Sequence, residues 1–287
     1  MQMLEAIFCD VDGTLTGHAT KPVDSEIRKY IMSLRKKGVK FGTATSHSIN
    51  GKQTKRFSKY YKLDFMVLEN GSVIYLREKN GSYSKLRSYE KENKQKLQHL
   101  RSLQKYFLRN SKKIKTSDFI LTHKGFYKIF YMEKIYLTVH FKKASFLIRT
   151  LSSNDDITPV IRILENECCR NKLDLKFIEP SKEFVEIGIA NKAEGVKYLA
   201  DHLDIPLKNV CAIGDADNDI EMLKLVGLPA CPADVSKKIK DIINKKHGII
   251  ASKNEYLGTR QILRRIAQFK VEVLAGELKP PEIGGEY

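Results

Sequence analysis

Several hallmarks of other protein classes are missing from this chain of 287 residues. No run of apolar residues approaches the roughly 18 that a membrane-spanning helix needs, and no secretory signal peptide precedes the first apolar segment. Internal repeats and low-complexity blocks are also absent, which excludes repeat arrays and biased disordered chains. We therefore expect a globular protein with no membrane partner.

Cysteine occurs in a pattern that suggests neither disulfides nor zinc. The chain has 5 cysteines, an odd number, and two of them are adjacent. No Cys-x-x-Cys spacing occurs, so a zinc site or a disulfide framework is not indicated. A reduced, cytoplasmic setting is the expectation that follows. The residues concerned are Cys9, Cys168, Cys169, Cys211 and Cys231.

Acidic residues are scarce relative to basic ones, and the formal net charge is +17. Residues 85–115 contain eleven Lys or Arg, with only Glu90 and Glu92 as acids. Such a stretch could bind nucleic acid or another anionic surface. Its leucines and Phe107 instead recur at helical spacing, which favours a helix with a solvated lysine face. We prefer the helix, and nucleic-acid binding stays open as an alternative.

Two carboxylates follow the first apolar run. The segment Ala6-Ile7-Phe8-Cys9 leads directly into Asp10-Val11-Asp12-Gly13-Thr14-Leu15. Open α/β sheets place their active sites at the carboxyl ends of strands, where this pair would lie. Two adjacent carboxylates repel each other unless a cation lies between them. The pair therefore indicates a site for a hard divalent ion such as Mg²⁺, although an ordinary strand end with an Asp-Gly turn is the simpler alternative.

Three further segments add polar groups at comparable places. The apolar run 210–213 leads into Gly214-Asp215-Ala216-Asp217-Asn218-Asp219, and the run 39–42 leads into Thr43-Ala44-Thr45-Ser46. Between them in the chain, Lys192 stands near the first turn of an expected helix. Taken singly, each has a simpler interpretation: the hydroxyls and aspartates would cap helices, and the lysine would be solvated.

These four segments resemble the four short motifs of the haloacid dehalogenase-like hydrolase superfamily. They share the order of those motifs, their spacing and the strand character of the flanking residues. The resemblance implies an α/β protein with a doubly wound, Rossmann-like core of parallel strands. It also implies a phosphatase, because the acid two residues after the first aspartate is absent from the dehalogenases and transport ATPases of the superfamily.

The resemblance assigns a role to each residue. Asp10 would be the catalytic nucleophile that forms an aspartyl phosphate, and Asp12 would be the catalytic acid and base. The groups that would bind phosphate are Thr45, Ser46, Lys192 and Asn218. The Mg²⁺ cofactor would be held by Asp10, Asp12 through its main-chain carbonyl, Asp215 and Asp219.

One position departs from the family pattern. Relatives that carry a cap domain often have Thr-Gly-Arg after the second strand, whereas this chain has Thr45-Ser46-His47. Either His47 substitutes for the arginine that contacts substrate in some relatives, or that contact is missing. A single histidine on a loop is more often merely polar.

The length of the chain is explained by an insert between the second and third motifs. We expect a hairpin around Asn70-Gly71, a basic helix from about residue 88, strands within 126–141, a helix over 158–171 and a strand pair over 174–178 and 184–189. This α+β segment resembles the cap of Cof-like sugar-phosphate phosphatases. It predicts a core formed by residues 1–79 and 187–287 and a cap formed by residues 80–186.

The sequence therefore predicts a Mg²⁺-dependent phosphatase of a small phosphorylated metabolite, either a sugar phosphate or a phosphorylated acid. A nucleotidase or phosphotransferase of the same fold is one alternative. A nucleic-acid or anionic-surface binder on a degenerate phosphatase fold is another, which the intact Asp10, Asp12, Lys192 and Asp215 argue against. No pattern indicates an oligomeric state.

Overall fold

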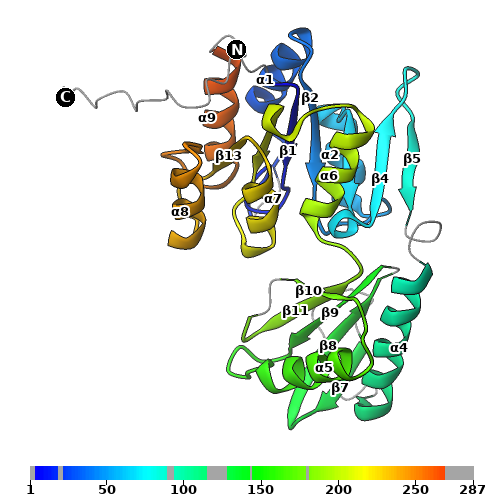
Figure 1. Ribbon diagram of the computed structural model, residues 1–287. Helices are drawn as coiled ribbons and strands as arrows, with labels where there is room; N and C mark the ends of the chain where they lie inside the picture. Colours follow the sequence, from blue (N-terminus) through cyan, green and yellow to red (C-terminus); the bar gives the residue numbers. More distant parts are fainter. Residues whose placement is uncertain are drawn as a thin grey trace, which may run out of the picture.

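The computed structural model of the chain describes residues 4–18, 22–88, 94–114, 128–142, 144–178 and 181–268. Two β-sheets organise these residues, and each carries its own helices (Figure 1). The larger sheet contains strands from both ends of the described chain, whereas the smaller sheet is built from the middle.

The larger sheet has eight strands in the order β14-β13-β12-β1-β2-β3-β4-β5. The six strands from β14 to β3 run parallel, and β4 and β5 are added antiparallel at the β3 edge. In chain order the strands are β1 (Ala6–Cys9), β2 (Lys40–Ala44), β3 (Phe65–Leu68), β4 (Val73–Arg77), β5 (Tyr83–Ser88), β12 (Val210–Ile213), β13 (Leu228–Cys231) and β14 (Ile249–Ile250).

Helices cover both faces of this sheet because its central strands are apolar on both sides. In β1, Ile7 and Cys9 pack with one hydrophobic cluster, and Ala6 and Phe8 pack with the other. The first cluster includes side chains of α1 (Ser25–Lys36), α2 (Lys52–Tyr61) and α9 (Glu255–Gln268). The second includes side chains of α6 (Lys192–His202), α7 (Ile220–Leu225) and α8 (Lys237–Lys245). The predicted doubly wound α/β core is confirmed.

The smaller sheet is antiparallel throughout, with the order β10-β11-β9-β8-β7-β6. Its strands are β6 (Lys112–Ile114), β7 (Lys128–Met132), β8 (Ile135–Phe141), β9 (Ser145–Thr150), β10 (Lys176–Ile178) and β11 (Phe184–Gly188). The helices α4 (Lys94–Asn110) and α5 (Thr158–Arg170) accompany it. Strand β11 runs directly towards α6 of the larger sheet (Figure 1).

The basic helix of the sequence prediction is α4, and its apolar side is buried. Leu97, Leu100, Leu103 and Phe107 lie in the core of the smaller sheet. The Phe107 ring lies 5.3 Å from the Phe130 ring, centroid to centroid. The packing of α4 is therefore explained by its leucines and Phe107, as expected for an amphipathic helix. Residues 89–93, which belong to the predicted basic stretch, lie outside the described residues.

Other predicted elements are also present. The hairpin at Asn70-Gly71 is formed by β3 and β4 around the short 3₁₀ turn Glu69–Gly71. The strand pair that closes the insert is β10 with β11. Strand β9 was not predicted. The prolines and glycines of residues 276–287 predict a flexible end, and this segment lies outside the described residues. Within the described ranges, we find no helix with the length and apolar character required to span a bilayer.

Gly71, in the turn of this hairpin, packs closely against the start of α6. Its φ is +92°, and a Cβ atom there would lie 2.3 Å from the carbonyl oxygen of Asn191. Gly38 has a similar φ of +84°, but a Cβ atom there would have no neighbour within 4 Å. A substitution at Gly38 would therefore carry only the cost of a left-handed backbone, whereas one at Gly71 would add the cost of a steric clash.

We expect Gly38→Ala to lower the free energy of unfolding by about 1–2 kcal/mol, the cost of a left-handed alanine. Gly71→Ala should cost more, above about 3 kcal/mol, because the clash is with backbone. Urea denaturation of both variants measures the difference. Equal losses would show that the contact between Gly71 and Asn191 is not tight.

Candidate active site

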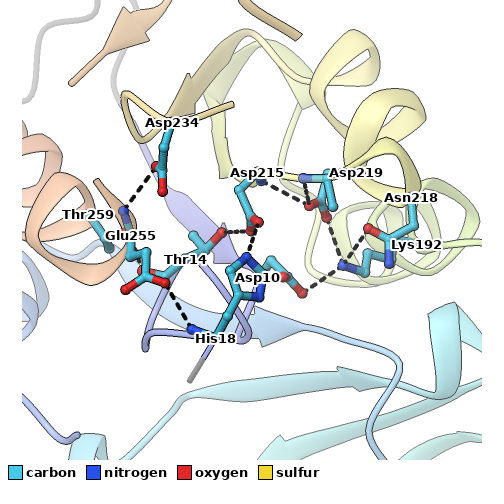
Figure 2. A network of polar contacts seen from close by, with 11 residues as sticks. Asp10, Thr14, His18, Lys192, Asp215, Asn218, Asp219, Asp234, Glu255 and Thr259 are labelled. Atoms are coloured by element: carbon cyan, nitrogen blue, oxygen red, sulfur yellow. Dashed lines mark hydrogen bonds and ion pairs between the residues drawn. The ribbon is translucent and has the colours of Figure 1, made fainter. Parts of the chain in front are cut away.

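The site lies where three parallel neighbours of the larger sheet end. Strands β12, β1 and β2 are adjacent and run in the same direction. Asp10 follows β1 directly, Thr45 follows β2, and Asp215 lies two residues beyond β12. Parallel strands bring these three loops to one edge of the sheet. Helix α6 adds Lys192 as its first residue (Figure 2).

Lys192 is the centre of the polar network. Its side chain is only 1% exposed, and its Nζ donates to Asp10 Oδ1 at 2.6 Å and to Asp219 Oδ1 at 2.7 Å. A longer contact of 3.3 Å reaches Asn218 Oδ1. An ammonium group has three protons, so these three oxygens account for all of its donors. The Asn191 side chain caps α6 by accepting from the Glu194 N–H, which fixes where the helix and its lysine begin.

Asp219 is fully buried, and both of its carboxylate oxygens are engaged. Oδ1 accepts from Lys192, and Oδ2 accepts from the backbone N–H groups of Asp215 and Ala216 at 3.0 and 3.1 Å. The side chain therefore shapes the loop that carries Asp215. With both oxygens occupied, Asp219 orients the residues that can bind an ion rather than offering a vacant oxygen of its own.

Asp215 contacts two residues to which the sequence assigned no role. The Thr14 hydroxyl donates to Oδ1, and the His18 Nε2 lies 3.3 Å from Oδ2 (Figure 2). The Thr14 carbonyl in turn accepts from the buried Thr259 hydroxyl at 2.7 Å, which anchors this loop to α9. Thr14 could have been noticed because it belongs to the first motif. His18 carries no comparable signal in the sequence.

The carboxyl groups of Asp10 and Asp215 are largely buried, and this burial changes their pKa values. Burial raises the pKa of the Asp10 carboxyl to about 8; the Lys192 ammonium opposes this shift, and the charges of Asp219 and Asp215 add to it. Burial and the neighbouring Asp219 raise the pKa of Asp215 to about 7. Burial alone would lower the pKa of Lys192, but Asp10 and Asp219 outweigh that effect and raise it.

Asp12 belongs to a second, adjoining group of contacts. Its Oδ2 lies 2.7 Å from the His47 Nε2. The backbone N–H of His47 donates to the Thr45 hydroxyl at 3.3 Å. His47, which stands in place of the family's arginine, therefore contacts the proposed acid and base.

The structure thus brings Asp10, Lys192, Asn218, Asp219 and Asp215 into one connected network. Asp12 and Thr45 are linked to each other through His47. Among the described residues, no hydrogen bond joins the side chain of Thr45 or Ser46 to Asp10 or Lys192. These two residues lie in the loop after β2, which is connected to Asp12 by the contact of His47.

The model for the family of haloacid dehalogenase-like hydrolases matches residues 7–261 of this chain. The chain belongs to this family. Among curated proteins, it is 26% identical over 274 residues to a protein of Buchnera aphidicola named as a phosphatase, covering 92% of this chain and 97% of that protein. A phosphoglycolate phosphatase of Methanopyrus kandleri is 22% identical over 254 residues, covering 84% and 89%. Matches to three other curated relatives span only 19–25% of the lengths of those proteins.

Solved structures of this family share the fold. BT1666 from Bacteroides thetaiotaomicron, described among phosphatases of the superfamily, aligns with a TM-score of 0.65 and 16% identity over 94% of this chain and 97% of its own. The subclass IIB sugar phosphatase BT4131 aligns with a TM-score of 0.61 and 14% identity over 93% of this chain and 100% of its own. Both alignments span the two sheets.

The site has the donor set of a hard divalent cation. One carboxylate oxygen each of Asp10, Asp215 and Asp219 lies within 4.8 Å of the other two; Asp10 and Asp215 can ligate an ion there, while Asp219 supports the loop of Asp215. Three carboxylates face one lysine there, so an excess of negative charge is concentrated in a buried place. Oxygen ligands of this kind suit Mg²⁺. The residues therefore fit the ion that this family typically uses.

We expect the metal-free protein to lose stability as the pH rises from about 4 to about 7, because folded Asp215 retains a proton that the unfolded chain has released. This one group contributes at most about 1.4 kcal/mol per pH unit. Asp215→Asn lacks that proton but retains an oxygen for Thr14, so its stability should decline less steeply. Chemical denaturation in the presence of EDTA measures both curves, and parallel curves would contradict the assignment.

Proposed function

We propose that this protein is a Mg²⁺-dependent phosphatase that hydrolyses a small phosphorylated metabolite through an aspartyl phosphate on Asp10. The observation that carries the proposal is the buried contact between Asp10 and Lys192. This contact fixes a carboxylate at a strand end, two residues before a second acid. A carboxylate held in this way can act as a nucleophile towards phosphorus.

The reaction would proceed in two displacements. In the first, a carboxylate oxygen of Asp10 bonds to phosphorus, the ester P–O bond breaks, and the departing alkoxide takes a proton from Asp12. In the second, Asp12 takes a proton from water as that water attacks phosphorus. The bond between phosphorus and Asp10 breaks, inorganic phosphate leaves, and both aspartates return to their starting states.

Lys192 would hold the phosphoryl group as well as the nucleophile. All three of its donors are engaged, so a phosphate oxygen must replace one of its partners. The longest contact is that to Asn218, at 3.3 Å, which makes Asn218 the partner most readily replaced. Thr45 and Ser46 would add hydroxyl or backbone donors from the loop after β2.

Bound Mg²⁺ would lower the repulsion between the anionic nucleophile and the anionic substrate. Asp10, Asp215 and the main-chain carbonyl of Asp12 would hold it, with Asp219 orienting the loop of Asp215. The short contacts from Thr14 and Asp219 to the Asp215 loop support this assignment, because they fix the loop independently of the ion.

The smaller sheet, which extends from β6 to the end of β11 at Gly188, would act as the cap predicted for residues 80–186 and would select the substrate. The names of the relatives suggest the substrate class: one is a phosphoglycolate phosphatase and another a sugar phosphatase. A sugar phosphate or a phosphorylated acid is therefore proposed. The five cysteines are free thiols, in accord with a cytoplasmic enzyme.

Asp10→Asn should abolish phosphate release from para-nitrophenyl phosphate, because an amide cannot form the acyl phosphate. Asp12→Asn should lower the rate on the order of 10²–10⁴-fold. Asp217→Asn is the matched control: this aspartate lies in the loop of Asp215 but is exposed and pairs with Lys238. It should retain activity. Substantial turnover by Asp10→Asn would refute the mechanism.

Activity should require Mg²⁺ and disappear with a chelator. Ca²⁺ should compete without supporting turnover, because its larger and more flexible coordination misplaces the reacting groups. Asp215→Ala should weaken Mg²⁺ binding in calorimetry, whereas Asp217→Asn should leave it unchanged. Calorimetry separates loss of the ion from loss of catalysis, and full activity in excess EDTA would exclude the metal.

A further inference from the structure

The loop after β2 is held from both sheets. Three consecutive residues of this loop, Thr45, Ser46 and His47, accept hydrogen bonds at their backbone carbonyls. The carbonyls of Thr45 and His47 accept from the N–H groups of Asn70 and Glu69, at 3.1 and 3.0 Å. The middle carbonyl, that of Ser46, accepts from the Lys142 Nζ at 3.4 Å. Two of these contacts come from the larger sheet, and the third comes from the turn after β8 of the smaller sheet.

The two contacts from the larger sheet come from a backbone that cannot easily move. Glu69 and Asn70 have φ values of +48° and +51°, a conformation that residues other than glycine rarely adopt. Such strain persists only where the surroundings enforce it, and it concentrates at functional sites. The loop is thus supported rigidly from the larger sheet, and the Lys142 side chain adds a support from the smaller sheet.

Lys142 is itself fixed by a buried acid. Its Nζ lies 2.8 Å from Glu186 Oε1, and the Ser145 hydroxyl donates to the same oxygen at 2.5 Å. The Glu186 side chain is only 7% exposed and that of Lys142 is 16% exposed. A buried carboxylate needs such partners, because burial without them is strongly unfavourable. Glu186 also lies on β11, six residues before Lys192 in the chain.

At its other end the same loop holds the proposed acid and base. The His47 Nε2 lies 2.7 Å from one carboxylate oxygen of Asp12, so the position of the His47 ring bears directly on the position of that carboxyl group. The Asp12 side chain is 35% exposed, so surrounding packing alone does not fix its direction. The contacts therefore run from Glu186 through Lys142, the Ser46 carbonyl and His47 to Asp12.

We propose that Lys142 is a positioning residue: when the smaller sheet is seated on the larger one, Lys142 holds the Ser46 carbonyl and so keeps His47 against Asp12. This inference rests on the phosphatase function proposed above. Proton transfer from Asp12 would then be fully effective only with the two sheets together. Misplacement of a catalytic group by a small distance is costly, which is why such a remote support matters.

The nature of the leaving group distinguishes this role from a structural one. Phenol is a poorer leaving group than para-nitrophenol and depends more on protonation by Asp12. Loss of positioning should therefore lower kcat/KM more on phenyl phosphate than on para-nitrophenyl phosphate. General damage to the fold would lower both alike.

We expect Lys142→Met to lower kcat/KM about tenfold on phenyl phosphate and less than about threefold on para-nitrophenyl phosphate. Lys142→Arg should restore most of the loss, because it can still donate to both Glu186 and Ser46. Lys105→Met is the control. This exposed lysine lies on α4, which packs against the same sheet, and its replacement should change neither kcat/KM value. If Lys142→Met does not fold, Glu186→Gln should show the same dependence on the leaving group, with a smaller loss.

A double-mutant cycle tests the route through His47. His47→Ala should show the same preference for para-nitrophenyl phosphate, and adding Lys142→Met to it should have little further effect. Additive losses, or equal losses on both esters, would overturn the proposal. If the wild type hydrolyses neither ester with Mg²⁺ present, the phosphatase assignment itself fails, and this inference fails with it.

Discussion

The ammonium group of Lys192 is the interaction on which the rest of the site depends. It is buried between two carboxylates, Asp10 and Asp219, that come from loops at opposite ends of the chain. Neither acid could lie in that place as a charged group without a cation beside it, and the lysine could not be buried without them. The lysine and the two acids therefore depend on one another, and their contacts fix the relative positions of α6, β1 and the loop after β12.

Much of this arrangement could be predicted because it follows from strand order. Apolar runs that end in polar residues identify β1, β2 and β12, and the geometry of parallel sheets brings their ends together. That geometry places Asp10 and Asp215 at one edge of the sheet, and the resemblance to the family's motifs adds Lys192 and Asp219. The apolar side of α4 could be predicted equally well, because Leu97, Leu100 and Leu103 recur at helical spacing.

What could not be predicted depends on contacts between distant segments. The bond from Lys142 to Ser46 joins two sheets across 96 positions of sequence, and neither residue belongs to a periodic pattern. The contact between His18 and Asp215 likewise depends on how a loop folds back. Strand β9 pairs with both β8 and β11, and these pairings depend on the assembled sheet as well as on its own residues.

The position of β1 in the larger sheet has a consequence for how the protein forms. This first strand pairs with β12, Ala6 beside Val210, so a nascent chain must emerge by roughly two hundred residues before the pair can exist. Strands β7, β8 and β9, by contrast, follow one another and pair as neighbours, and such local contacts form quickly. During synthesis the smaller sheet can assemble while β1 still lacks its central partner. The catalytic centre is thus completed late, when the strand leading to Asp215 joins a segment made about two hundred residues earlier.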